Sequence, residues 1–300
     1  MILPKISIIT VCYNMENYIE QTILSVLSQD YPNLEYIIVD GGSTDNTITV
    51  VNKYSSKISK IICEPDNGMY DAINKGINAS TGDVVAWLNA DDSYFPWTLK
   101  TIAKIFAEHS DINWISGIPA FLDEDRNLTN IYTHAAAKPA KAIASGWFRE
   151  GVYGYLQQEG MFWRRNLYCN SGGLDVNYKY AGDFELWTRF ALHSDLLTVA
   201  IPLGAFMKRN AGISIGSREK YLKEIQKACL GKKEYPSVLW KFTDSLLIRH
   251  IFRLLTISKS KLCYYSSVNK KFLVKTVHRS VSSNSLSELR YEYIYRKNEI

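Results

Sequence analysis

Four segments of this sequence place carboxylates or amides directly after runs of apolar, β-branched residues. Carboxylate and amide oxygens bind hard divalent cations and accept or share hydrogen bonds with ribose and base edges. A set of this kind suits a site for a nucleoside, its ribose and a metal ion. The segments are Tyr13-Asn14, Asp40-Gly-Gly-Ser-Thr-Asp45, Glu64-Pro-Asp-Asn-Gly68 and Asn89-Ala-Asp-Asp92.

Each segment also has a plainer interpretation when it is taken alone. Asp40-Gly41-Gly42-Ser43 suits a tight turn followed by a helix cap, and Asp91-Asp92 suits the cap of a helix that begins near Phe95. Both interpretations stay open for each segment. A shared location at one end of one sheet would favour the ligand site, because unrelated caps need not gather there.

The segments connect elements that alternate between strand and helix. Strands are predicted over residues 6–12, 34–39, 58–63 and 83–88, and helices over 16–29, 46–54 and 70–79. This alternation predicts parallel strands joined by right-handed crossovers, with ligands bound beyond the carboxyl ends of the strands. Further along, we predict a strand over 112–118, an irregular insertion over 119–150, a helix over 183–193 and a strand over 197–207.

The ordered motifs resemble those of the family-2 glycosyltransferases. The resemblance is carried by Ser7-Ile-Ile-Thr-Val-Cys-Tyr-Asn14, Val39-Asp-Gly-Gly-Ser-Thr-Asp45, Glu64 to Gly76 and Leu88-Asn-Ala-Asp-Asp92. It is strong over residues 5–95, weaker over 155–190, and fades beyond about 215. It implies an α/β GT-A fold, with a Rossmann-like, mostly parallel sheet flanked by helices.

The resemblance also implies a set of donor-site residues. Tyr13 would lie against the nucleobase, Asp40 would accept a hydrogen bond from its edge, and Asp91 would reach a Mn²⁺ or Mg²⁺ ion on the diphosphate. Asn89 stands where the family usually has Asp, so it would contact the ribose or sugar, and Asp92 is the reserve metal ligand. The implied nucleotide-sugar-binding residues are Val11, Tyr13, Asn14, Asp40, Asp66, Lys75, Asn89 and Asp91.

A second group of residues would serve the acceptor. Asp183 opens a helix, and Gly182-Asp183 resembles the family's acidic catalytic motif, usually Glu-Asp, with Gly182 in place of the Glu. Asp183 would then be the general base of an inverting reaction. A plain helix cap is the alternative for Asp183, and Glu185 is a weaker candidate for the base. Gln158, Glu159 and Trp187 are the implied acceptor residues, although Trp187 also suits the protein core.

The net charge of +5 is unevenly distributed. Residues 217–300 contain 18 Lys and Arg against 7 Asp and Glu, a net charge of +11, so the preceding part carries −6. We divide the chain into a catalytic domain over 1–215 (nucleotide half 1–110, acceptor half 111–215) and a basic, mainly helical extension over 216–300. Residues 236–257 form an amphipathic pattern that suits either a helix on an anionic membrane or a helix packed on the domain. No nucleic-acid recognition module accompanies the charge, and no nucleic-acid partner is expected.

These observations predict a hexosyltransferase that uses a nucleoside-diphosphate sugar, with UDP expected from family frequency. The acceptor would be a saccharide or lipid-linked saccharide of bacterial surface polysaccharide or glycolipid synthesis. Five cysteines without CxxC spacing, and no signal-peptide pattern, favour the cytoplasm, with the inner face of the membrane as a further location. Two alternatives stay open: a nucleotidyltransferase that makes the sugar nucleotide, and a non-catalytic binder of it.

Overall fold

The computed structural model describes residues 2–132, 138–150, 154–209, 217–232, 257–266 and 271–280. Its first part alternates strands and helices as the sequence predicts. The elements are β1 (Ile6–Cys12), α1 (Ile19–Leu27), β2 (Leu34–Asp40), α2 (Thr47–Asn52), η1 (Ser55–Lys57), β3 (Lys60–Cys63), α3 (Met69–Ala79), β4 (Val84–Asn89), β5 (Ser93–Tyr94) and α4 (Thr98–Glu108).

The second part mixes short strands and helices. The elements are β6 (Trp114–Ser116), β7 (Ala120–Leu122), β8 (Leu128–Ile131), α5 (Ala140–Ala144), η2 (Gln158–Gly160), β9 (Met161–Arg164), α6 (Arg165–Asn170), α7 (Gly182–His193), β10 (Leu196–Val199), β11 (Gly204–Met207), α9 (Arg218–Cys229), β12 (Ile257–Ser266) and β13 (Lys271–Ser280). No helix in the described ranges is both long enough and apolar enough to cross a membrane.

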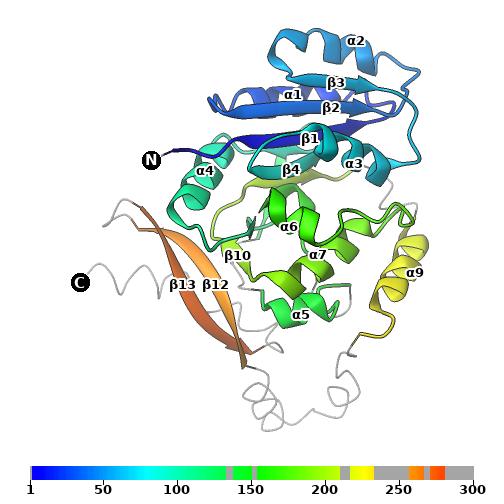
Figure 1. Cartoon of the computed structure of the whole chain (residues 1–300). Coiled ribbons are helices and arrows are strands. Elements are labelled where there is room, and N and C mark those ends of the chain that lie inside the picture. Colours follow the sequence, from blue (N-terminus) through cyan, green and yellow to red (C-terminus); the bar gives the residue numbers. More distant parts are fainter. Residues whose placement is uncertain are drawn as a thin grey trace.

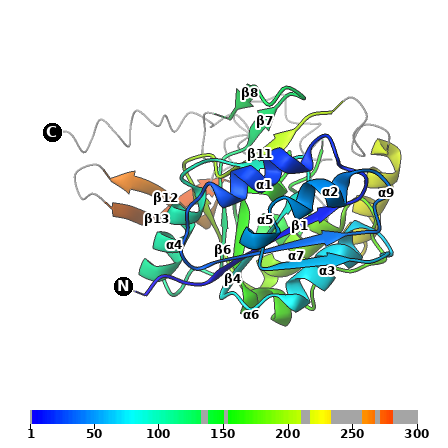
Figure 2. The same ribbon diagram turned by 90° about the horizontal axis from the view of Figure 1, so that it is seen from above.

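A nine-stranded, mostly parallel sheet forms the centre of the molecule, in the order β13-β12-β10-β6-β9-β4-β1-β2-β3. Strands β4, β1, β2 and β3 run parallel, and β9 is antiparallel to both of its neighbours. Helices α1 and α2 cover one face of the first strands and α3 covers the other (Figures 1 and 2). Every residue of β1 is buried, which fits its continuous apolar sequence. The predicted α/β fold with a mostly parallel sheet is therefore confirmed.

A cluster of aromatic rings fills the core beneath β4, β6 and β9. Trp87 stacks on Trp187 with 5.6 Å between ring centroids, and Trp163 meets Trp87 edge-on at 5.3 Å. Trp114 meets Phe190 at 5.4 Å in the same way. Buried aromatic pairs of this geometry stabilise a fold beyond the area they bury, so this cluster joins α7 firmly to the sheet.

Two predictions about the later elements are wrong. The predicted single strand over 197–207 is divided into β10 and β11, which belong to different sheets, because the chain turns at Pro202 between them. Strand β11 joins a four-stranded sheet in the order β5-β11-β7-β8. The second wrong prediction is the irregular stretch over 119–150, because it contains strands β7 and β8 and helix α5.

The basic extension is not wholly helical. Strands β12 and β13 form an antiparallel hairpin at the edge of the main sheet, and Leu197–Val199 of β10 pair in parallel with Lys261–Cys263 of β12 (Figure 1). The two strands contain β-branched and aromatic residues that favour extended structure, and they pair with each other over their full length. The amphipathic stretch 236–257 lies outside the described residues except for its last position.

Candidate functional site

The turns after β1 and β2 are bound to one another at the carboxyl edge of the sheet. The backbone N–H of Asn14 donates to Ser43 Oγ at 2.8 Å, and Asn14 Oδ1 accepts the N–H of Thr44 at 2.9 Å. Asn14 adopts a left-handed conformation with φ of 52°, which Asn tolerates better than most residues. Tyr13 is 58% exposed beside this turn, while the side chain of Val11 is buried in the core. Tyr13 is thus available to a ligand, whereas Val11 can offer only its backbone.

Asp40 is fully buried, and its carboxylate is turned into its own loop. Oδ2 accepts the N–H groups of Gly42 at 3.0 Å and Ser43 at 2.8 Å, and Oδ1 accepts the Ser43 hydroxyl. The thiols of Cys12 and Cys63, on the neighbouring strands, also donate to the carboxylate, at 3.5 and 3.3 Å. These oxygens stabilise the turn, and the expected contact between Asp40 and a base edge stays a prediction.

Asp66 lies directly against the backbone of that turn. A Cβ atom on Gly41 would stand 2.4 Å from Asp66 Oδ2, so only glycine allows this approach. Asp66 Oδ1 accepts the N–H of Gly68 at 2.8 Å. Lys75 donates to Glu64 at 3.0 Å and to the Pro65 carbonyl at 3.0 Å. Lys75 therefore holds the loop that carries Asp66.

The loop after β4 separates its two aspartates by environment. Asp92 is fully buried; its Oδ1 accepts the N–H of Met207 at 2.9 Å, and its Oδ2 accepts Asn89 Nδ2 at 3.1 Å. Burial, with Glu159 and Asp91 nearby, raises the pKa of Asp92 well above its usual value. The reserve assignment of Asp92 as a metal ligand does not fit this environment, because the carboxylate is already used inside the protein.

Asp91 keeps 13% of its side chain exposed and forms an ion pair with Arg209, Oδ2 to Nε, at 2.7 Å. The Arg209 guanidinium also lies 4.8 Å from the ring centre of Tyr18. The Arg209 guanidinium shows that a positive charge is stabilised beside the Asp91 carboxylate. Nearby Asn89 Oδ1 is buried and has no hydrogen-bond partner.

These two oxygens fit the protein's share of a divalent-cation site. No three His, Cys, Asp or Glu side chains group as a metal site within the described parts of the chain. A cation held partly by a diphosphate needs only one or two protein oxygens. Asp91 would supply the carboxylate and Asn89 Oδ1 is the available amide oxygen.

Gln158 and Glu159 lie below this loop, in η2. Gln158 Nε2 donates to the Trp87 carbonyl at 2.6 Å, and Gln158 Oε1 accepts from Asn89 Nδ2 at 3.4 Å. Glu159 is buried, and its Oε2 has no hydrogen-bond partner. Burial, together with the charges of Asp183 and Asp91, raises the pKa of Glu159 to about 7. Glu159 can therefore hold a proton near neutral pH.

Asp183 lies in the first turn of α7, half-buried beside Tyr70 of α3. The Tyr70 hydroxyl donates to Asp183 Oδ1 at 3.4 Å. Burial raises the pKa of Asp183 to about 6, although the N–H groups of Phe184 and Asp183 and the Tyr70 hydroxyl oppose the shift. A carboxylate with this pKa can accept a proton near neutral pH. The Glu185 carboxylate instead accepts two hydrogen bonds from the Arg189 guanidinium, at 2.7 and 2.5 Å.

Trp187 does not reach any acceptor. Its side chain is 1% exposed and stacks within the aromatic core against Trp87. The expected acceptor role of Trp187 is therefore wrong, because the ring is enclosed by other aromatic side chains.

Three residues that the sequence did not indicate take part in this arrangement. Arg209 pairs with Asp91, Tyr70 contacts Asp183, and Glu224 accepts N–H groups from the segment before α7. Tyr70 lies inside the motif from Glu64 to Gly76, so its position in that motif could have indicated that it belongs to the site. Arg209 and Glu224 carry no local pattern, because their partners lie far away in the sequence.

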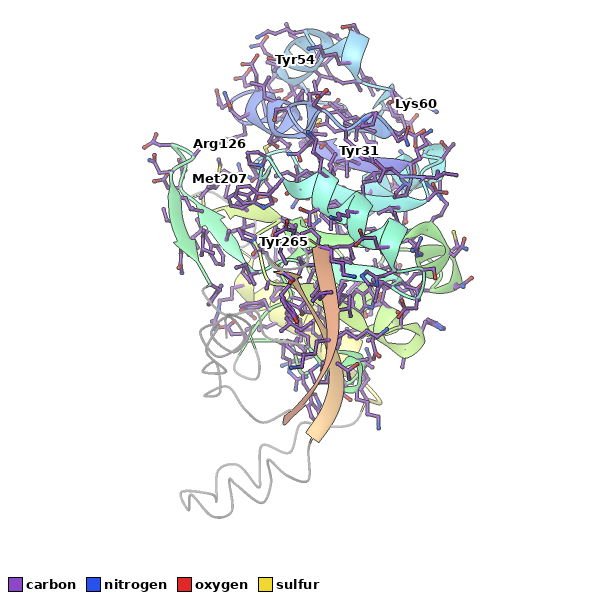
Figure 3. All side chains as sticks on the ribbon, turned by 90° about the vertical axis from the view of Figure 1, so that its left-hand side faces the viewer. Tyr31, Tyr54, Lys60, Arg126, Met207 and Tyr265 are labelled. Atoms are coloured by element: carbon purple, nitrogen blue, oxygen red, sulfur yellow. The ribbon has the colours of Figure 1, made fainter. Side chains whose placement is uncertain are left out.

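A cavity of about 570 Å³ lies elsewhere, between α1 and the small sheet, and none of the predicted site residues lines it. Arg126 lines it and donates to Ser93 Oγ at 2.6 Å and to the Tyr18 carbonyl at 2.8 Å. Figure 3 labels Arg126 on this side of the molecule. The ionisable groups described above, Asp91, Glu159 and Asp183, lie outside this cavity.

Comparison with known proteins gives consistent results. A sequence profile described as "Glycosyl transferase family 2" matches residues 7–169. An uncharacterized glycosyltransferase of Nostoc sp. is 40% identical over 167 residues, which cover 54% of this chain and 52% of that protein. The chain thus spans about half the length of this relative. A PGL/p-HBAD biosynthesis glycosyltransferase of Mycobacterium bovis is 27% identical over 66% of this chain and 74% of its own.

Two solved structures show the same fold. Residues 1–349 of S. aureus TarS in complex with UDP-GlcNAc superpose with a TM-score of 0.58 and 20% identity, covering 78% of this chain and 68% of that one. The mannosyltransferase PcManGT of Pyrobaculum calidifontis, in complex with GDP-Man and Mn²⁺, has a TM-score of 0.57 and 20% identity, covering 79% and 67%.

Proposed function

Because this chain belongs to glycosyltransferase family 2, we propose that it transfers a hexose from a UDP-sugar to an acceptor hydroxyl with inversion at the anomeric carbon. The observation that carries the proposal is Asp183: it is a half-buried carboxylate with a pKa raised to about 6, separate from the Asp91 loop. A single displacement needs one base beside the acceptor.

In the proposed reaction, Asp183 accepts the proton of the acceptor hydroxyl while the hydroxyl oxygen forms a bond to the anomeric carbon. The bond from that carbon to the diphosphate oxygen breaks, and its electron pair leaves with the diphosphate. Tyr70 orients the carboxylate through its hydroxyl group. Glu159, whose pKa burial raises to about 7, would be a second ionisable group near Asp183.

Asp91, with Asn89, would hold a Mn²⁺ or Mg²⁺ ion. When bound, such an ion stabilises the negative charge that develops on the leaving diphosphate. Tyr13 would lie against the base, and Asp66 and Lys75 would shape the donor loop. Arg209 must then exchange its contact with Asp91 for one with the donor's negative charge.

The relatives support the class of donor that we propose. One structural relative was solved with UDP-GlcNAc and another with GDP-Man and Mn²⁺, which motivates a nucleoside-diphosphate sugar and a divalent ion. The acceptor would be a saccharide or lipid-linked saccharide of bacterial surface polysaccharide or glycolipid synthesis. The reaction would occur in the cytoplasm, with residues 236–257 as a peripheral contact to the inner face of the membrane.

The experiment offers the full chain a panel of UDP-sugars and GDP-mannose with simple saccharide acceptors, in Mn²⁺, Mg²⁺ or EDTA. We expect release of UDP that depends on the divalent ion, and a β-linked product from an α-linked donor, measured by the anomeric proton coupling in NMR. A retained anomer would exclude inversion. Absence of diphosphate release with every donor would favour the alternative of a non-catalytic binder.

A further inference from the structure

Helix α9 supplies a carboxylate to the segment that directly precedes the catalytic helix. Glu224 Oε1 accepts the backbone N–H of Lys179, and Oε2 accepts those of Tyr180 and Ala181, each at 2.8 Å. Figure 1 shows α9 beside α7, although the two helices belong to distant parts of the sequence. One side chain thus fixes three consecutive peptide groups.

These peptide groups lie at the beginning of α7, where a helix needs partners for its N–H groups. The residue before α7, Ala181, has no side chain that could cap it. Glu224, from another helix, accepts the N–H of this cap residue and those of the two residues before it, and its negative charge suits the positive end of the α7 dipole.

This arrangement decides what the Asp183 carboxylate does. Glu224 satisfies the N–H groups that precede the helix. The Asp183 carboxylate accepts those of the first turn, from Asp183 itself and Phe184, together with the Tyr70 hydroxyl. The direction of the carboxylate therefore depends on the segment that Glu224 holds.

The support for Glu224 is itself rigid. Ile225 and Ala228 of α9 are buried in the main core, and Tyr221 packs against it. Because these side chains anchor the helix, Glu224 is held by the core rather than by an exposed loop.

We propose that Glu224 is a positioning residue for sugar transfer: it fixes residues 179–181 and thereby sets the direction in which the Asp183 carboxylate meets the acceptor hydroxyl. The proposal rests on the proposed role of Asp183 as the base. Positioning of this kind is worth a large factor in rate, because a displacement of about 1 Å costs on the order of a hundredfold.

The charge of Glu224 gives the proposal a specific signature. Four titratable groups interact with Asp183: Tyr70 from α3, Glu159 from η2, and Tyr221 and Glu224 from α9. Burial is the largest cause of the raised pKa of Asp183, and the negative charge of Glu224 adds to it. Removal of that charge lowers the pKa of the base, so activity persists to lower pH.

The test compares two substitutions in the full chain. Glu224→Gln keeps the length of the side chain and removes its charge, whereas Glu224→Asp keeps the charge and shortens the reach. We expect kcat to fall about tenfold in both variants, with the donor KM unchanged. The acidic limb of the kcat–pH profile should move to lower pH in Glu224→Gln and stay near the wild-type position in Glu224→Asp.

Glu219→Gln is the matched control, because Glu219 lies on the same helix, is exposed, and pairs with Lys223 of the same helix. It should leave kcat, KM and the pH profile unchanged. Wild-type kcat and an unmoved limb in Glu224→Gln would overturn the proposal. So would a loss of kcat in both Glu224 variants that only parallels a loss of melting temperature and donor affinity.

Asp183→Asn separates this proposal from the one on which it rests. If Asp183→Asn retains near-normal turnover, the proposed base is wrong and the role of Glu224 fails with it. If Asp183→Asn is inactive while Glu224→Gln behaves as the wild type, only the positioning role is overturned.

Discussion

Carboxylates that are largely removed from solvent have different partners in two regions of the molecule. At the amino edge, Glu35 of β2 accepts Lys5 Nζ, Ser7 Oγ and the N–H of Thr81, each at 2.6 Å, and the Thr81 hydroxyl at 2.8 Å. Burial alone would raise the pKa of Glu35, but these hydrogen bonds lower it to about 2.

At the carboxyl side of the molecule, Glu159 and Asp183 have weaker partners than Glu35. Glu159 Oε2 has no partner, and Asp183 accepts its own N–H, the Phe184 N–H and a long contact from the Tyr70 hydroxyl at 3.4 Å, none of which is a charged donor. Burial therefore dominates, and the pKa values rise to about 7 and about 6. A carboxylate that accepts several strong hydrogen bonds therefore keeps a low pKa and stabilises this fold. A carboxylate that is buried with weaker donors has a raised pKa and can exchange protons near neutral pH.

The largest effect should come from Asp183. Asp183→Asn keeps the shape and removes the proton acceptor, so kcat should fall roughly a hundredfold or more, with donor binding near that of the wild type. Steady-state kinetics and calorimetry measure both. Asp195→Asn, an exposed position just after α7, is the control. Near-normal turnover in Asp183→Asn would move the search for the base to Glu159.

Glu35→Ala should change stability instead of activity. It removes the partner of Lys5, Ser7 and Thr81, and should lower the free energy of unfolding by about 2 kcal/mol at pH 7 while kcat is retained. Because the folded pKa is lowered, this contribution is full above pH about 4.5 and is lost as the pH falls toward 2. Urea unfolding measures it. The exposed Glu20→Ala should lose far less; an equal loss would contradict the comparison.

Asp91 and Asp92 differ in the same way within one loop: Asp91 is partly accessible, whereas Asp92 is fully buried and hydrogen-bonded inside the protein. Asp91→Ala should weaken binding of UDP in the presence of Mn²⁺ by on the order of tenfold, because it removes the accessible carboxylate. Asp92→Ala should lower the melting temperature and leave the Mn²⁺ dependence, because Asp92 holds Met207 and Asn89. Calorimetry with and without Mn²⁺ decides; the reverse ranking would place the metal ligand at Asp92.

The smallest effect concerns stability against pH. The folded pKa of Asp183, about 6, lies above its usual value of 3.8, so the folded state binds more protons between these values. Stability should fall as the pH rises from about 4 to 6, and Asp183→Asn should be more stable than the wild type above pH 6. The difference should vanish toward pH 4. Thermal melts across this range that show no convergence would contradict the raised pKa.

The sequence predicted the fold well where local pattern and tertiary environment agree. The β-branched runs that became β1 and β2 are buried on both faces, so their apolar character is continuous and easily recognised. The sequence predicted the fold poorly where a strand pairs with residues far away in the chain. Strand β12 joins the main sheet through its parallel pairing with β10. Strand β11 likewise belongs to a separate sheet that local pattern does not indicate.

By itself, the sequence determined which chemistry is available at the carboxyl edge: polar residues follow each strand, and the alternation of elements brings them together. The tertiary structure decided which of them are free to act. Asp92 is occupied by Met207, at a separation of 115 residues, and the Asp183 segment is fixed by Glu224 of a later helix. The physical reason is that burial and hydrogen-bond saturation depend on partners from distant elements, and local sequence spacing contains no record of them.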